Sequence, residues 1–257
     1  MQDKTIAIMT GRGIWADYIY NSFKEDFSGV KIIIERPQPR LEILRKRLKK
    51  LGPVTVLGQN LFNLCAKPYL RLASRKRISQ IAREYDFNAS HIAAADRIDV
   101  PSVNSDETIA YLQRLGPDVV ILYGSRIIEE RVLGCISAPF INMHTGLTPA
   151  YRGLNATYWA LVKSGVSASG VTVHMVDRGL DTGAILEQKQ TSPSAEDSFF
   201  TYDWFQLGEG LPVLKKAVKD LLEGTARVKP PLLDGSGVCS DPTLREYLWH
   251  RIFNHKK

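Results

Sequence analysis

Three polar side chains stand where the sequence predicts a strand end and a nearby turn. Asn142 and His144 are two residues apart at the end of the apolar run Phe140 to Met143. Because side chains alternate along a strand, both point to the same side. Asp181 lies in the sequence Gly-Leu-Asp-Thr-Gly, where glycines let the backbone approach a ligand closely. These groups suit acyl transfer, in which Asn142 and a protonated His144 would stabilise an oxyanion and Asp181 would hold the imidazolium.

The residues around these three leave some alternatives open. Asn142 and His144 can also be read as a polar strand end that caps a loop. No serine or cysteine stands in a sequence typical of a nucleophile, so direct attack by a substrate amine is favoured over a covalent intermediate. The proton of that amine has three candidate acceptors, which are Asp181, His144 and a bound water. His174 lies inside a further predicted strand, where a structural role is at least as good an interpretation as a site role.

A sheet must position these side chains. The segments that read as buried strands are Thr5–Met9, Val30–Ile34, Val100–Val103, Val119–Tyr123, Phe140–Met143, Gly170–Val176 and Ala184–Gln190. Helical patterns separate most of them, so we predict an α/β fold with a Rossmann-like, doubly wound, mostly parallel sheet. Ligands bind at the carboxyl ends of strands in such sheets, where Asn142 and His144 stand. Gly11, Gly13 and Ala16 form a weak dinucleotide fingerprint without an acidic partner, and a turn that faces a substrate phosphate is the preferred reading.

Charge is concentrated in one part of the chain. We expect a catalytic domain over residues 1–195 that contains a basic helical insertion at about 36–85, and a helical C-terminal extension over 196–257. Between Arg36 and Arg83, thirteen Lys and Arg residues stand against the single acid Glu42. Such a segment could attract RNA, a membrane surface or a phosphate-rich nucleotide, although a solvated helix face is the commoner outcome. Phe62 and Tyr69 are its only aromatic residues, which disfavours a stacking platform for single-stranded nucleic acid.

Composition excludes several other classes of protein. The chain has 257 residues, of which 44% are hydrophobic and 24% charged, as is ordinary for a globular protein. No apolar run approaches the roughly 20 residues of a membrane-spanning helix, and the N-terminus does not resemble a signal peptide, so we expect a cytoplasmic location. Cys65, Cys135 and Cys239 lie far apart without a CXXC pair. The sequence therefore predicts neither a disulfide framework nor a metal site.

Successive motifs between about residues 100 and 190 resemble those of the folate-dependent formyltransferases. The motifs are Asn142–His144, Leu147–Gly153, Gly170–His174 and Leu180–Gly183, which occur in the family's order and spacing. The resemblance implies that Asn142, His144 and Asp181 form the catalytic trio and that 10-formyltetrahydrofolate donates the formyl group. It also implies that the strand-to-loop segment Leu122–Ile128 and the loop 176–181 hold the pterin ring. The implied donor-binding residues are Tyr123, Gly124, Ser125, Arg126, Ile127, Asp177 and Gly179. Departures from the family pattern at Thr145, Gly146 and Thr148 affect the expected loop shape and not the trio.

Within this family, the chain looks most like the N-formyltransferases of nucleotide-linked amino sugars, which include the GDP-perosamine N-formyltransferases of surface polysaccharide (O-antigen) synthesis. This resemblance rests on Tyr151–Gly153 followed by Trp159–Leu161. The implied substrate contacts are Tyr151, Arg152, Gly153 and Asn155.

Two alternatives use the basic segment. Methionyl-tRNA formyltransferases carry a further barrel domain that binds tRNA, whereas the residues after Gln190 read as helices. A non-catalytic nucleic-acid-binding module would not need the trio. We therefore expect a nucleotide-sugar substrate and disfavour nucleic acid as a partner. The sequence specifies neither the sugar nor the base, and it is compatible with a homodimer.

Overall fold

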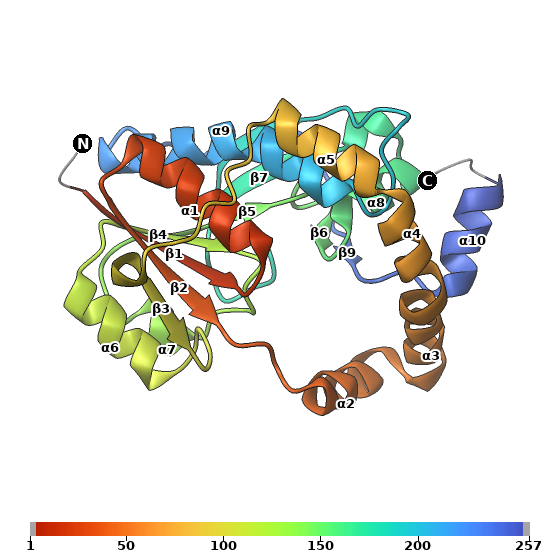
Figure 1. The fold of residues 1–257 in the computed structure, drawn as a ribbon, viewed down its shortest axis with the longest axis horizontal. Helices are drawn as coiled ribbons and strands as arrows, with labels where there is room; N and C mark the ends of the chain where they lie inside the picture. Colours follow the sequence, from red (N-terminus) through yellow and green to blue (C-terminus); the bar gives the residue numbers. More distant parts are fainter. Residues whose placement is uncertain (1–3, 254–257) are drawn as a thin grey trace.

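A seven-stranded sheet forms the centre of the computed structural model, which describes residues 4–253 (Figure 1). Its strands are β1 (Thr5–Gly11), β2 (Gly29–Glu35), β3 (Arg97–Val100), β4 (Val119–Tyr123), β5 (Phe140–His144), β7 (Gly170–Met175) and β8 (Ile185–Gln190). Their spatial order is β3-β2-β1-β4-β5-β7-β8. Pairing is parallel from β3 to β5, and β7 runs antiparallel to both β5 and β8. The predicted doubly wound, mostly parallel sheet is confirmed.

The order of the strands fixes where a ligand can bind. The chain runs outward from β1 to β2 and β3, then returns to place β4 on the other side of β1 and continues to β5. In such sheets the crevice lies at the carboxyl ends of the strands where this order reverses. The third strand spans Arg97–Val100 and not the expected Val100–Val103, and the Val103 amide instead donates to the Glu35 carboxylate in the turn after the strand.

Alternation along the strands builds a core on each face of the sheet. In β1, Ile6 and Ile8 pack into one cluster, whereas Ala7 and Met9 pack into another. The first face is covered by α1 (Ile14–Asp26) and α9 (Tyr202–Leu222), and the second by α6 (Asp106–Leu115) and α7 (Glu130–Leu133) (Figure 1). The chain thus has three layers, with the strand ends free to carry loops.

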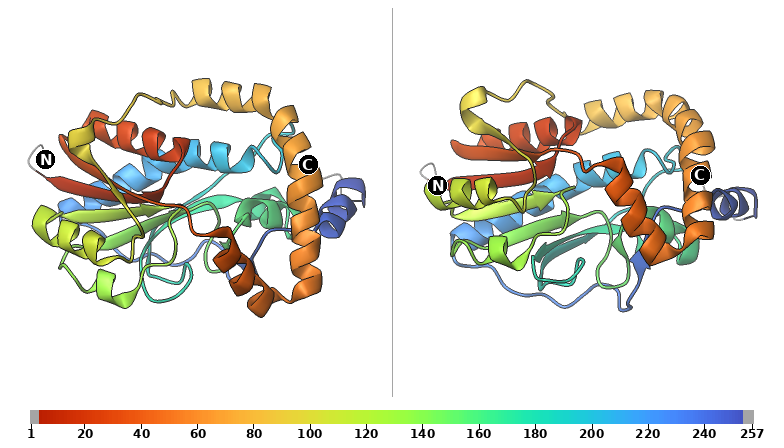
Figure 2. Two further views of the ribbon diagram at one scale, coloured as in Figure 1. Left: turned by 60° about the horizontal axis from the view of Figure 1, so that its bottom comes forward. Right: turned by 90° about the horizontal axis from the view of Figure 1, so that it is seen from below.

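Helices fill the basic segment between β2 and the short helical turn η2 (Ala94–Asp96) before β3. They are α2 (Arg40–Leu51), α3 (Pro53–Leu61), the π-helical turn η1 (Phe62–Ala66), α4 (Lys67–Ala73) and α5 (Arg75–Glu84). No residue of α2 is buried. Figure 2 shows α2 and α3 standing away from the sheet, while α5 returns the chain alongside α9. Buried Asp197 accepts hydrogen bonds from Arg77 at 2.8 and 3.3 Å and so holds α5, the last helix of the basic segment, in place.

The chain after residue 195 contains the expected helices, but the longer of them, α9, packs on the sheet. Leu207, Leu211 and Leu214 of α9 are buried in the core cluster of the sheet, so a boundary at 195 does not separate two cores. The segment from 223 to 243 is largely irregular, and its short strand β9 (Val238–Cys239) pairs with β6 (Arg152–Gly153). The remaining helical elements are α8 (Ala156–Lys163), η3 (Val166–Ala168) and α10 (Leu244–Phe253). Within residues 4–253, no helix combines the length and apolar character needed to cross a membrane.

Candidate active site

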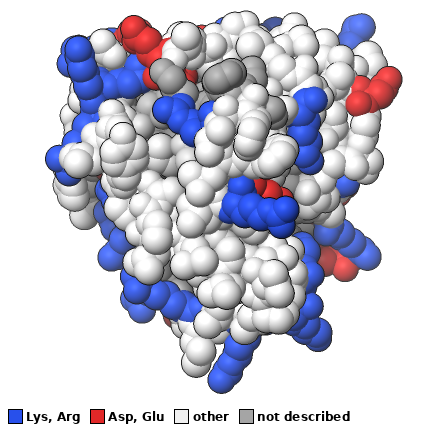
Figure 3. Space-filling view, turned by 90° about the vertical axis from the view of Figure 1, so that its right-hand side faces the viewer, with Lys and Arg blue, Asp and Glu red and all other residues white. Residues whose placement is uncertain are grey.

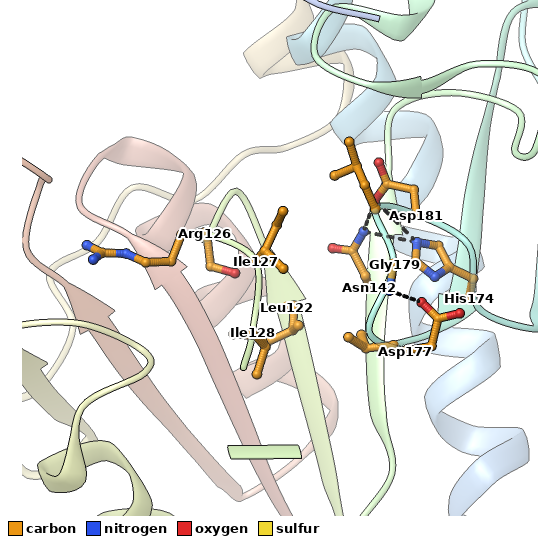
Figure 4. A pocket seen from close by; sticks show the side chains of 12 residues that line it. Leu122, Arg126, Ile127, Ile128, Asn142, His174, Asp177, Gly179 and Asp181 are labelled. Carbon is orange, nitrogen blue, oxygen red and sulfur yellow. Dashed lines mark hydrogen bonds and ion pairs between the residues drawn. The ribbon is translucent and has the colours of Figure 1, made fainter. Parts of the chain in front are cut away.

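Asn142, His174 and Asp181 meet at one end of the sheet (Figure 4). The antiparallel register of β5 and β7 sets Asn142 opposite His174, and the loop after β7 brings in Asp181. The Asn142 side-chain nitrogen lies 3.1 Å from His174 Nε2 and donates to Asp181 Oδ1 at 3.3 Å. His174 Nε2 also lies 3.6 Å from Asp181 Oδ1. An amide, an imidazole and a carboxylate therefore do converge, but the imidazole at their centre is His174.

The hydrogen bonds of His174 define which ring nitrogen carries a proton. Its Nδ1 lies 2.8 Å from the Met175 carbonyl oxygen, which can only accept. This contact assigns a proton to Nδ1 and leaves Nε2 to accept from Asn142. The residue is buried yet lines the pocket, so the structure favours a site role over the structural one. Strand alternation alone does not reveal this, because the pairing with Asn142 depends on the register.

His144 lies on the other side of Asp181 and is held by the backbone. Its Nε2 donates to the Tyr151 carbonyl oxygen at 2.9 Å, and its Nδ1 lies 3.6 Å from Asp181 Oδ2. Burial lowers the pKa of the His144 imidazole, and this effect outweighs the nearby Asp181 carboxylate and the Tyr151 carbonyl, which raise it. The expected imidazolium is therefore disfavoured at neutral pH. His144 is also absent from the residues that line the adjoining pocket.

Asp181 is held as a carboxylate. Burial alone would raise its pKa, but the adjoining His174 and His144 rings and the Gly153 amide together lower the pKa to about 2. The Gly153 amide donates to Asp181 Oδ2 at 2.9 Å. The backbone of Asp181 has φ 52°, in the left-handed region where aspartate is tolerated better than most residues. This loop conformation turns the carboxylate toward both imidazoles.

Contacts within the loop that carries Asp181 determine the shape of that loop. A Cβ on Gly183 would lie 1.6 Å from the Met175 carbonyl oxygen, so only glycine allows this close approach. Asp177 Oδ1 accepts from the Gly179 amide at 2.9 Å and from the Thr182 hydroxyl at 2.7 Å. These contacts give the turn a fixed shape beside the sheet.

A small pocket of about 80 Å³ opens beside Asn142, His174 and Asp181 (Figure 4). Its other lining residues are Leu122, Ser125, Arg126, Ile127, Ile128, Val176, Asp177, Gly179 and Leu180. Five of the seven residues expected to bind the formyl donor are thus in its wall. Tyr123 and Gly124 are not, since Tyr123 packs into the core on the α1 side. We call this space the pterin pocket after the ring expected to enter it.

Arg126 has partners of its own at the pterin pocket. Its guanidinium forms an ion pair with Glu35 and donates to the Arg36 carbonyl oxygen at 3.0 Å, while its amide donates to Glu35 at 2.9 Å. The side chain therefore holds the end of β2 against the loop after β4. These contacts hold the Arg126 side chain in one position in the pocket wall.

A second and larger cleft, of about 780 Å³, lies between the start of α1, the helices α4 and α5, and the start of α9. Its cations are Arg12, Lys67, Arg71 and Arg75, and its aromatic residues are Trp15, Phe199, Phe200 and Trp204. Arg12 pairs with Asp99 at 3.0 Å and Lys67 with Asp241 at 3.7 Å. Within residues 4–253, Arg71 and Arg75 are exposed and have no such ion pair. We call this space the basic cleft.

The four expected substrate contacts occupy different positions. Asn155 lines the basic cleft and donates to Asp241 at 3.0 Å. Tyr151 is buried with its hydroxyl 2.6 Å from Ser164 Oγ, and Arg152 pairs in β6 and donates to Ser236 Oγ at 3.2 Å. Gly153 uses its amide to hold Asp181. Of these four residues only Asn155 lines the basic cleft, whereas Tyr151 and Arg152 are turned toward structural partners.

Comparison with known proteins identifies the family. The family model described as formyl transferase matches residues 4–203, most of the chain, which therefore belongs to the formyl transferase family. No group of His, Cys, Asp and Glu within residues 4–253 is arranged to hold a metal ion.

Two relatives that act on different substrates are about equally similar to this chain. A GDP-perosamine N-formyltransferase of Brucella melitensis is 31% identical over 124 residues, which cover 48% of this chain and 48% of that protein. A methionyl-tRNA formyltransferase of Thermodesulfovibrio yellowstonii is 33% identical over 130 residues, which cover 50% of this chain and 42% of that protein. The matched regions thus span about half the length of these relatives.

Solved structures agree in fold. A sugar N-formyltransferase from a Shewanella species aligns with a TM-score of 0.55 at 16% identity, over 92% of this chain and 78% of that chain. A phosphoribosylglycinamide formyltransferase from Bacillus halodurans aligns with a TM-score of 0.53 at 21% identity, over 85% and 95% of the two chains. At these identities the likeness concerns the fold alone.

Proposed function

We propose that this protein transfers the formyl group of 10-formyltetrahydrofolate to the primary amine of a nucleotide-linked amino sugar such as GDP-perosamine. The product would serve surface polysaccharide (O-antigen) synthesis. The observation that carries the proposal is the convergence of Asn142, His174 and Asp181 at the mouth of the pterin pocket. Family membership and the similarity to a GDP-perosamine N-formyltransferase support it.

The lining of the pterin pocket fits one end of a folate. Its walls are apolar at Leu122, Ile128 and Val176, while the loop after β4 and the loop 176–181 bring backbone groups to its edge. A flat heterocycle with several donors and acceptors suits such a slot, and about 80 Å³ admits only that end of the molecule. When bound, the donor supplies a formyl group on an aniline-type nitrogen of low basicity, which is a good leaving group.

Asn142 is placed to stabilise the charge that develops on the formyl oxygen. One of its amide hydrogens faces His174 and the other faces Asp181. Asn142 must therefore break one of these two hydrogen bonds before it can donate to the formyl oxygen. A single oxyanion donor is worth about 10²- to 10³-fold in rate. Binding of the substrate therefore requires the Asn142 amide to exchange one of these two partners for the formyl oxygen.

The proton of the attacking amine goes to an imidazole in this proposal. With its pKa lowered to about 2, Asp181 is a weak base and is better suited to stabilise positive charge on the amine nitrogen. His144 donates to the Tyr151 carbonyl oxygen through Nε2, and its basic Nδ1 faces Asp181. His174 instead lines the pocket, and its Nε2 accepts from Asn142. We therefore assign the proton to His174 Nε2, once the Asn142 amide has turned toward the substrate.

The basic cleft is the proposed site of the amino-sugar nucleotide. Asn155 lines this cleft two residues after Gly153, whose amide holds Asp181, so the cleft leads toward the carboxylate. Arg71 and Arg75 offer charge to a diphosphate, and Trp15 and Trp204 offer ring surfaces to a base or sugar. Methionyl-tRNA is the second candidate acceptor, because the basic segment and the methionyl-tRNA formyltransferase relative favour it.

Release of tetrahydrofolate from 10-formyltetrahydrofolate tests the proposed function. The acceptors are GDP- and dTDP-linked 4-amino sugars, glycinamide ribonucleotide and methionyl-tRNA, with Asp181→Asn as the inactive control. We expect turnover with an amino-sugar nucleotide. Turnover with methionyl-tRNA alone would refute the proposed acceptor. If the donor binds but no acceptor in the panel reacts, the proposed class of acceptor is wrong.

Substitutions in the basic cleft test the acceptor site separately. We expect Arg71→Ala and Arg75→Ala each to raise KM for the sugar nucleotide by about tenfold, the usual effect of losing a charged hydrogen bond, while KM for the donor stays constant. Arg83→Ala is the matched control, because Arg83 is exposed on α5 outside the cleft. An unchanged acceptor KM in both cleft variants would exclude this cleft.

A further inference from the structure

The outer side of α3 and η1 is an apolar ridge. Val54, Leu57, Leu61 and Leu64 follow one another at intervals of three or four residues and are 83%, 61%, 41% and 75% exposed. This spacing places them on one side of a continuous helical segment, while Val56 and Phe62 are buried on the opposite side. The helix thus has two apolar sides, of which only one packs on the protein.

The last described helix extends this ridge. In α10, Trp249, Ile252 and Phe253 are exposed, and the rings of Trp249 and Phe253 lie 4.3 Å apart between centroids. A shallow groove of about 530 Å³ joins α10 to α3 and is lined in part by Val54 and Trp249. We call the combined surface of α3, η1 and α10 the outer face. Apolar surfaces of this kind mark sites of interaction with proteins or membranes.

Cations surround the outer face. Exposed Lys and Arg residues on α2, which contacts α3, and on α10 are Arg40, Arg45, Lys46, Lys49, Lys50, Arg245 and Arg251. The acid of α2, Glu42, pairs with Lys46 at 2.7 Å. Glu246 accepts from the Thr243 amide and hydroxyl, both at 2.8 Å, in the cap of α10. Figure 3 shows this side of the molecule as a largely white surface with blue side chains along its margins and also within it, and with little red.

We propose that the outer face docks on an anionic lipid surface. A membrane interface offers both an apolar layer for Leu, Val and Trp side chains and negative headgroups for a rim of Lys and Arg. A nucleic acid backbone would meet the rim but leave the ridge in water. A second copy of this chain would cover the ridge but bring two strongly positive segments together. The combination of ridge and rim therefore selects the anionic membrane.

The site of this docking is separate from the proposed chemistry. Neither the pterin pocket nor the basic cleft includes a residue of α2, α3, η1 or α10. Membrane binding is thus independent of the proposed function, and it would hold the enzyme at a surface without occupying its clefts.

Co-sedimentation of the full chain with vesicles tests the proposal. One set of vesicles contains phosphatidylcholine with about a third phosphatidylglycerol, and the other contains phosphatidylcholine alone. We expect binding to the anionic vesicles, weakening as salt is added and at least tenfold weaker on the neutral ones. The double variant Val54→Glu/Leu57→Glu should lose at least tenfold in vesicle affinity. Lys49→Gln and Lys50→Gln should each cost about fivefold.

Matched variants and a second measurement keep the test decisive. Val228→Glu and Arg227→Gln change an exposed valine and an exposed arginine outside the outer face, and their vesicle binding should equal that of the unaltered chain. Absence of binding to anionic vesicles would overturn the proposal, as would full binding by Val54→Glu/Leu57→Glu. Light scattering reports the mass in solution without lipid. A dimer that dissociates in Val54→Glu/Leu57→Glu would assign the outer face to a second copy instead.

Discussion

At the scale of single residues, one carboxylate lies between two imidazoles in different surroundings. Asp181 contacts His144 through one oxygen and His174 through the other, each at 3.6 Å. Each imidazole is hydrogen-bonded to a backbone carbonyl, but only His174 lines the pterin pocket. We therefore assign different roles to the two histidines: His144 positions the loop, and His174 transfers the proton.

This assignment predicts the effect of changing His174. We expect His174→Gln to lower kcat by about 10²- to 10⁴-fold, the range for loss of a general acid or base, because glutamine keeps a hydrogen bond but takes no proton. KM for the donor should change little. Steady-state kinetics check this, with His91→Gln as the control, since His91 is exposed and outside both clefts. A kcat close to that of the unaltered enzyme would return the proton to His144 or to water.

Asp181 should also contribute to acid stability. Its pKa is about 2 in the folded chain against an ordinary value of 3.8, so the carboxylate stabilises the fold fully above about pH 4. That contribution, roughly 2 kcal/mol, is lost as the pH falls toward 2. Asp181→Asn tolerates the same left-handed backbone and lacks the titration. Urea unfolding from pH 5 to pH 2 should show a steeper loss in the unaltered protein. Parallel pH profiles would contradict the lowered pKa.

At the scale of elements, the sequence predicts the strands and helices better than their pairings. The order of the elements indicates the doubly wound sheet, and alternation places Asn142 and His144 on one side of β5. The register that sets Asn142 opposite His174 depends on contacts between strands distant in sequence. Sequence pattern alone therefore could not choose between the structural and the site role of His174.

Loop residues show the same limit. Tyr151 and Arg152 look like substrate contacts because they follow the strand that carries Asn142 and His144. In the structure, β6 pairs with β9, which is more than eighty residues away, and this pairing turns Arg152 toward Ser236. Conversely, the sequence shows the basic segment directly. The apolar ridge of α3 can be identified only from the structure, which shows which side of the helix is buried.

At the scale of the whole molecule, the sheet is completed by a helix from the far end of the chain. Leu207, Leu211, Leu214 and Val218 of α9 are buried on the face that α1 also covers. Loss of one buried leucine typically costs 2–5 kcal/mol, and a domain has only about 5–15 kcal/mol in all. The family match ends at residue 203, near the start of α9, and so does not reach these leucines. From this burial we expect the catalytic fold to require residues beyond 195.

Truncation tests this requirement. We expect a chain ending at residue 195 to show no cooperative thermal unfolding, because removal of α9 exposes one face of the sheet. A chain ending at residue 242 is the control. It lacks α10, whose Tyr247 packs 5.1 Å from Phe62 between ring centroids in a separate aromatic cluster, but it keeps α9 on the sheet. This longer chain should unfold cooperatively at a lowered midpoint. Thermal unfolding is monitored by near-ultraviolet circular dichroism. Cooperative unfolding of the 1–195 chain would show that the sheet and α1 suffice for a stable fold and that the domain boundary at 195 is correct.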